Sequence, residues 1–144
     1  MDDAMQTASL IFVPVWIVEV QTPQEDMERL LAVVTGIDPL AMTAAYDHNA
    51  FVDAAGTEVY RPRDGAVAGC EEEDRHRPGV VALRFEIGSD ETLCAVAEAV
   101  FQAHGYQEPV IRAVRGLSAR SRGLDDRDNP NRWWNRAGDW KAQG

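Results

Sequence analysis

Two stretches of this sequence, one near each end, have the pattern of a β-strand followed directly by an amphipathic helix. In the first stretch, residues 10–20 are rich in β-branched and aromatic side chains, which is typical of a buried strand. The next four residues, Thr22-Pro23-Gln24-Glu25, resemble a capping box with proline at the first helical position. Apolar side chains then recur at helical spacing as far as Gly36, where we expect the helix to end. The sequence therefore predicts a strand–helix unit over residues 10–35.

The second unit begins with residues 80–87, whose later half alternates apolar and charged side chains as a half-buried strand does. Ser89 is the expected N-cap of the following helix, because acidic residues fill the first turn after it. The helix is expected to end at Gly105, and residues 109–117 form the last predicted strand. The apolar face of this helix consists of Leu93, Val96, Ala97, Val100 and Phe101.

Between the two units, residues 44–51 and 57–61 have the composition of strands on either side of a turn at residues 53–56. Residues 62–78 are expected to form a long loop, because prolines, glycines and a run of four acidic residues interrupt them. Right-handed crossovers place both helices on one face of an antiparallel sheet. The sequence thus predicts an α+β fold, a ferredoxin-like βαββαβ sandwich with an extra hairpin.

The chain has 144 residues, enough for one hydrophobic core but too few for two sizeable domains. We expect a domain over residues 1–117 and an Arg- and Trp-containing tail over residues 118–144. No apolar run approaches the ~20 residues that a membrane-spanning helix needs, so no membrane association is expected. The acidic start, Met1-Asp2-Asp3, lacks the positive charge of a signal peptide. These features favour a cytoplasmic location.

The net charge of −10 is concentrated in the predicted domain, which contains 20 of the 24 acidic residues. An acidic body repels phosphates, which disfavours nucleic-acid binding by the domain. The tail leaves an alternative open, because its arginines recur among Trp133, Trp134 and Trp140 and such pairs can stack on bases. Packing of these tryptophans on the domain or on a neighbouring subunit is the favoured interpretation, since the tail carries only a small positive charge.

Histidine is a common metal ligand, and the chain has three histidines. If the sheet brings the start of the last strand near residues 44–51, then Asp47, His48, His104 and Glu108 form a mixed nitrogen and oxygen cluster. Such a cluster suits zinc or another borderline divalent ion. The favoured alternative is that His104 caps the end of its helix and hydrogen-bonds to the backbone. The third histidine, His76, is expected to be a loop residue.

The sequence contains no nucleophile elbow, no phosphate-binding loop of the GxxxxGK[ST] type and no GxGxxG pattern. Arg61 ends a predicted strand beside Gly65 and Gly69, where it is a candidate anion contact. Pairing of Arg61 with the acidic loop is the favoured alternative. No constellation of catalytic residues emerges, which favours a non-enzymatic protein.

Three motifs in order resemble a known family: Tyr46-Asp47-His48-Asn49-Ala50-Phe51, then Gly56 with Tyr60-Arg61-Pro62 and Gly65, then His104-Gly105-Tyr106-Gln107-Glu108-Pro109. They resemble the CutA-like domain inserted in bacterial proteins of the Nif-three (YqfO) family and its small stand-alone relatives. That family has YDHCxF, GxGxFRPxxGAxPxxG and HPYEEP in the same order. The likeness spans roughly residues 10–117. The chain departs from these patterns at four positions: Asn49 for Cys, Glu58 for Gly, Gly105 for Pro and Gln107 for Glu.

The resemblance implies a CutA/PII-type fold that tends to form trimers through sheet-edge contacts. It implies a non-enzymatic, oligomeric regulatory module that binds a small ligand or a metal ion. The dinuclear metal site and any hydrolase activity of the full-length proteins belong to a separate, larger domain and are not transferred. In this interpretation the ligand-binding residues are Tyr46, Arg61 and Tyr106, and the metal or proton-linked groups are Asp47, His48, His104 and Glu108.

Two other functions stay open. The first is a small metal-dependent hydrolase or isomerase that uses His48 and His104 with a zinc-like ion. The second is a nucleic-acid-binding protein that acts through the tail. The cofactor is otherwise unknown, and a homotrimer is the favoured assembly.

Overall fold

The computed structural model describes residues 5–123 and 125–136. The chain divides into two compact units, one from Val13 to Ser118 and one formed by the residues on either side of that span. The larger unit contains most of the sheet, both α-helices and most of the candidate functional residues. No helix among the described residues is long and apolar enough to cross a membrane.

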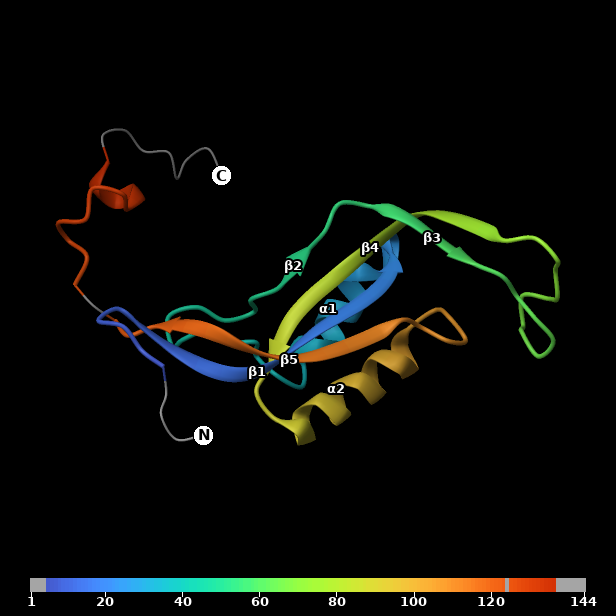
Figure 1. Ribbon diagram of the computed structural model, residues 1–144, viewed down its shortest axis with the longest axis horizontal. Coiled ribbons are helices and arrows are strands. Elements are labelled where there is room, and N and C mark those ends of the chain that lie inside the picture. The colour runs from blue at the N-terminus through green and yellow to red at the C-terminus, as the bar shows by residue number, and fades with distance from the viewer. Residues whose placement is uncertain (1–4, 124, 137–144) are drawn as a thin grey trace. The chain divides into compact units, whose positions relative to one another are not determined.

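The fold has a five-stranded sheet and two α-helices (Figure 1). Its elements in chain order are β1 (Leu10–Pro23), η1 (Gln24–Asp26), α1 (Met27–Thr35), β2 (Phe51–Val52), β3 (Gly56–Tyr60), β4 (Arg75–Ile87), α2 (Asp90–Ala103) and β5 (Ile111–Ser121). The strand order is β2-β4-β1-β5, and β3 also pairs with β4. β1 and β4 are antiparallel, with Trp16 opposite Ile87 and Pro23 opposite Val80. The predicted ferredoxin-like α+β fold is confirmed.

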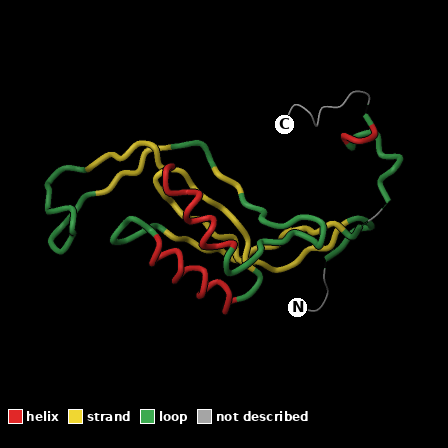
Figure 2. Tube along the Cα trace, turned by 180° about the vertical axis from the view of Figure 1, so that it is seen from behind, coloured by secondary structure: helices red, strands yellow, loops and turns green. Residues whose placement is uncertain are grey.

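Both helices pack against the same face of the sheet, as Figure 2 shows from behind. Cross-strand partners project from the same face, and the pairs Val18–Phe85 and Val20–Leu83 are buried in the core. The helices contribute fully buried side chains to the same cluster, namely Leu30, Val34, Val96 and Val100. The other face of the sheet therefore carries the alternate residues of each strand.

The two helices begin differently. Ser89 caps α2 as predicted, because its hydroxyl oxygen accepts a hydrogen bond of 3.1 Å from the backbone N–H of Thr92. The predicted capping box before α1 is wrong. Thr22 lies in β1 opposite Val81, and a 3-10 turn over Gln24–Asp26 leads into the helix. The tertiary pairing of β1 with β4 overrides the local capping signal.

The segment between the two strand–helix units departs most from expectation. Of the strand predicted over 44–51, only Phe51 lies in a strand, the two-residue β2, which pairs with β4 rather than with β3. β4 begins at Arg75, inside the predicted loop, so that β3 and the first half of β4 form the hairpin. The register of this hairpin shifts between Gly56 and Glu58. The loop that closes it covers residues 61–74.

In the smaller unit, a tight turn leads into the first residues of β1, with an isolated bridge between Gln6 and Ile11. The Thr7 hydroxyl accepts hydrogen bonds from two backbone N–H groups of this turn. The tail contains the short helix η2 (Trp133–Asn135). Arg132, the residue before it, forms an ion pair of 2.6 Å with Asp126. Trp133 and Trp134 make an edge-to-face contact. Trp140 lies outside the described residues.

Candidate functional site

His104 is a buried residue that joins the end of α2 to β1. Its side chain is 8% exposed, and Nε2 lies 2.7 Å from the carbonyl oxygen of Gln21. Nδ1 accepts a hydrogen bond of 3.1 Å from the backbone N–H of Tyr106. A carbonyl oxygen can only accept and an amide N–H can only donate, so the ring is neutral with its proton on Nε2. Both ring nitrogens are occupied by backbone partners, as in the helix-capping alternative.

Tyr106 lies beside His104 and under an arginine. The ring centroids of Tyr106 and His104 are 4.7 Å apart, and the guanidinium carbon of Arg77 lies 4.9 Å from the Tyr106 ring. The Tyr106 hydroxyl is buried, and no hydrogen-bond partner lies within reach of it among the described residues. Burial raises the pKa of Tyr106, the negative charge of Glu58 raises it further, and Arg77 opposes both.

The turn that carries Tyr106 also holds the loop over residues 61–74. Gln107 accepts a hydrogen bond of 2.8 Å from the backbone N–H of Val67 and donates one of 3.3 Å to the carbonyl oxygen of Gly65. Glu108, the next residue, is exposed. Arg61 is exposed at the start of the same loop and has no carboxylate within 4.0 Å among the described residues. The favoured pairing of Arg61 with the acidic loop is therefore not formed, and the acidic run pairs with Arg63 and Arg75 instead.

Tyr46, Asp47 and His48 lie in an exposed loop beyond the end of α1. Tyr46 is 74% exposed, and His48 has a left-handed backbone with φ of 53°. The end of α2 lies at the other end of α1, because Arg29 in its first turn donates to the carbonyl oxygen of Ala103. The helix α1 separates the two places by a rise of about 13 Å.

Within one chain, the structure therefore does not bring Asp47 and His48 together with His104 and Glu108. No group of three His, Cys, Asp or Glu side chains among the described residues is placed to hold a metal ion. The predicted metal set stays a prediction. Stoichiometric metal after purification without chelator, lost in His104→Ala, is the result that would support it.

The sheet face away from the helices carries a chain of ion pairs that crosses its strands. Glu19 lies between Arg84, at 3.1 Å, and Arg112, at 3.3 Å. Arg84 also pairs with Asp53 at 2.6 Å. Partial burial alone would raise the pKa of Glu19, but hydrogen bonds and charge from Arg84 and Arg112 lower it below its ordinary value.

Gln21 extends this network toward Tyr106. In the amide orientation that satisfies both neighbours, its nitrogen donates to Glu58 at 3.0 Å and its oxygen accepts from Arg112 at 3.1 Å. We call the sheet surface with Ile17, Glu19, Gln21, Arg84, Arg112 and Gly116 the outer face.

Apolar side chains lie beside these ion pairs. A Cβ at Gly116 would meet the Ile17 side chain at 2.9 Å, so the two residues are neighbours on the outer face. Alternation along β5 puts Val114 on the same face, where it is 59% exposed. Phe51 is the cross-strand partner of Arg84 and is 65% exposed. The outer face thus combines paired charges with exposed apolar surface.

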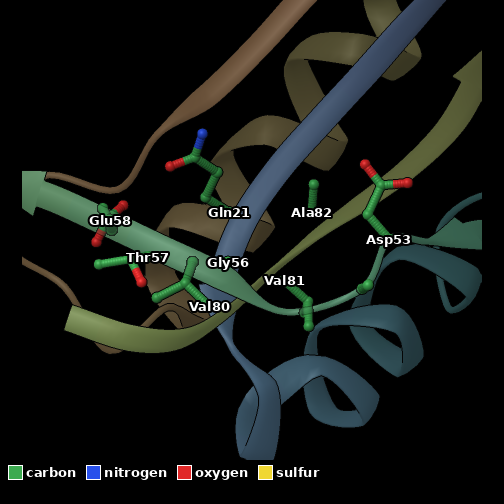
Figure 3. A pocket seen from close by; sticks show the side chains of 9 residues that line it. Gln21, Asp53, Gly56, Thr57, Glu58, Val80, Val81 and Ala82 are labelled. Carbon is green, nitrogen blue, oxygen red and sulfur yellow. The ribbon is translucent and has the colours of Figure 1, made fainter.

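A shallow hollow of about 180 Å³ lies at the margin of this face, where β2 and β3 separate (Figure 3). Asp53 and Glu58 stand on opposite sides of it, and Val80, Val81 and Ala82 of β4 lie between them.

Sequence reasoning missed the outer-face residues Glu19, Gln21 and Arg84, together with Asp53, Glu58 and Arg77. A signal was present for three of them, because Arg84 is one of the charged side chains that alternate with apolar ones in residues 80–87. Glu19 and Gln21 alternate with the buried Val18 and Val20 in β1, which is the pattern of a strand with one polar face. No local signal identifies Asp53 or Glu58, because their partners are distant in sequence.

No family model matches the chain, and no curated protein matches its sequence. Solved structures do match. A Bacillus cereus protein related to NIF3 has a TM-score of 0.60 at 17% identity, over 79% of this chain and 27% of that chain. CutA1 from Oryza sativa has a TM-score of 0.52 at 21% identity, over 72% of this chain and 81% of that chain. The fold is CutA-like.

CutA1 from Ehrlichia chaffeensis gives the same result, with a TM-score of 0.52 at 16% identity over 71% of this chain and 80% of that chain. That structure is described as a divalent ion tolerance protein. At these identities the likeness establishes the fold alone. This chain spans about a quarter of the NIF3-related protein, so the CutA-like fold corresponds to one part of that larger chain.

Proposed function

We propose that this chain is a non-enzymatic regulatory module that works as a homo-oligomer, with the outer face as the contact between subunits. The CutA-like fold supports a small regulatory or ion-tolerance role in general terms. The composition of the outer face is the observation that carries the proposal. Apolar side chains on this face are exposed, whereas its charged side chains already form ion pairs within one chain.

The electrostatics of this face favour contact with a second copy. Two charges buried without partners would cost several kcal/mol each. Glu19 and Asp53 are already paired with Arg84 and Arg112, so an identical face can approach without leaving a carboxylate unpaired. Burial of Val114 and Phe51 supplies the driving force, at roughly 25 cal/mol per Å² of apolar surface removed from water. The assembly that we propose is the trimer implied by the family resemblance, with the outer face added to the sheet-edge contacts that the resemblance implies.

The test is a charge placed in the middle of the proposed contact. We expect Val114→Glu to shift the mass measured by light scattering from oligomer to monomer, because it buries an unpaired carboxylate. Ala95→Glu is the matched control, since Ala95 is exposed on α2 in the opposite layer and glutamate suits a helix. Circular dichroism of both variants checks that they are folded. An oligomer that survives Val114→Glu would contradict the proposed contact.

A further inference from the structure

Arg77 lies where three segments that are distant in sequence meet. It is in β4 opposite Glu58 of β3, and its guanidinium covers the ring of Tyr106 from the turn after α2. The register shift between Gly56 and Glu58 lies opposite Pro78 and Gly79, and Gly79 has a φ of 75°. Such an irregularity re-aims the neighbouring side chain of a strand. Beside this irregularity, the guanidinium of Arg77 lies over the Tyr106 ring.

The charge environment of Arg77 is unusual for this chain. In the larger unit, carboxylates lie within 4.0 Å of Arg29, Arg63, Arg75, Arg84, Arg112 and Arg115. Among the described residues, no carboxylate lies that close to Arg77 or to Arg61, and of these two arginines Arg77 is the one that lies over an aromatic ring. Its cross-strand partner Glu58 is bound to the Gln21 amide instead. In a domain with a large excess of acidic residues, this guanidinium is left without a counter-ion.

The guanidinium of Arg77 lies over the ring of Tyr106 rather than beside a carboxylate. Tyr106 has the largest effect in raising the pKa of Arg77, and Tyr60 adds to it. Tyr106 is in turn fixed by the buried His104, through the backbone hydrogen bond and the ring contact. An arginine that stacks on an aromatic ring keeps its in-plane N–H groups free for a ligand, and little side-chain entropy is then lost on binding.

We propose that Arg77 is the recognition residue of a site for a small oxyanion, a carboxylate or phosphate group, with Tyr106 as its platform. A planar guanidinium binds either group through two parallel hydrogen bonds. The inference deepens the proposed function, because it gives the regulatory module a class of ligand. It does not depend on the outer face, and Arg61, the anion contact expected from the sequence, has no part in it.

The test follows the Arg77 side-chain Nε–Hε resonance by NMR during titration of the full chain. Sodium phosphate and sodium acetate are titrated separately at constant ionic strength, with sodium chloride as the replaced salt. We expect a saturable shift with phosphate, with acetate or with both, and the tighter of the two identifies the group that the site prefers. A shift that chloride reproduces, or no shift with either oxyanion, would overturn the proposal.

Variants assign the site to one arginine. Arg77→Gln is expected to weaken binding about tenfold or more, because it removes a charged bidentate contact. Affinity is read in the variants from backbone amide shifts of the turn over residues 104–109. Arg61→Gln is the matched control, an exposed arginine on the same hairpin without a carboxylate partner, and we expect a change of about twofold at most. Equal losses in both variants, or full binding by Arg77→Gln, would overturn the assignment. The mass of the same samples reports separately on the proposed assembly.

Discussion

The imidazole of His104 and the backbone carbonyl of Gln21 lie 2.7 Å apart, and this contact ties the end of α2 to β1. The second ring nitrogen holds the backbone of Tyr106, so a single buried side chain fixes a helix end, a strand and a turn. His104 is thus a structural residue whose position determines where Tyr106 and Gln107 lie.

His104→Ala is expected to lower the free energy of unfolding by about 2–4 kcal/mol, because it leaves two backbone groups without partners in a buried place. Urea denaturation measures the effect. His76→Ala is the control, since His76 is an exposed histidine of β4. We expect the control to change stability by less than about 0.5 kcal/mol. Equal effects of the two variants would show that the His104 contacts do not contribute.

His48 has a φ of 53°, in a region that non-glycine residues adopt only at a cost. His48→Gly is expected to leave stability unchanged or raise it by up to about 1 kcal/mol, because glycine adopts this backbone without strain. His48→Val is expected to lower stability by about 1 kcal/mol or more, since a branched side chain suits this region poorly. Thermal unfolding of the pair measures the difference. A more stable valine variant would rule out the left-handed conformation.

Glu19 contributes to stability in a pH-dependent way. Its pKa in the folded chain lies below the ordinary value of 4.5, so its contribution is fully present above pH 4.5 and is lost as the pH falls through the folded pKa. Glu19→Gln is therefore expected to be less stable than the wild type at pH 7 and to approach it at pH 3. Urea midpoints across this range measure the effect. With Glu108→Gln, an exposed control, the midpoints are expected to track the wild type throughout. A constant gap for Glu19→Gln would show that the ion pairs do not set its titration.

Gln107 joins the turn after α2 to the loop over residues 61–74. Gln107→Ala is expected to speed hydrogen exchange at the Val67 amide about tenfold, because that N–H loses its acceptor while the loop stays on the surface. Global stability is expected to change little. Gln102→Ala, which removes an exposed bond to Glu98 on α2, is the control. Unaltered exchange at Val67 in the Gln107 variant would show that another contact holds the loop.

Local periodicity was enough to predict the two strand–helix units, because each depends on side chains within one element. The Ser89 cap and the helix end at Gly36 were predicted for the same reason. The early start of β4 was not predictable, since residues 75–79 become a strand only through pairing with β3. Pro78 and Gly79 are residues typical of loops, and in the structure they lie in β4 where its register with β3 shifts.

The expected cluster of His48 and His104 was not found within one chain, although the predicted topology was correct. Each helix runs back along the strand before it, and β1 and β4 are antiparallel, so the two helices end at opposite ends of the sheet. The topology predicted from the sequence thus already separated the two histidines. Arg77 was missed for another reason. Its importance comes from the absence of a counter-ion and from the Tyr106 ring, and both depend on contacts between distant segments.

The molar mass of the wild-type chain in solution tests the central claim most directly. Light scattering over a range of protein concentrations compares the measured mass with the chain mass of 15.9 kDa. We predict a mass three times that of the chain, held as the protein is diluted into the micromolar range. A mass equal to one chain at every concentration would contradict the proposal that the outer face is a contact between subunits.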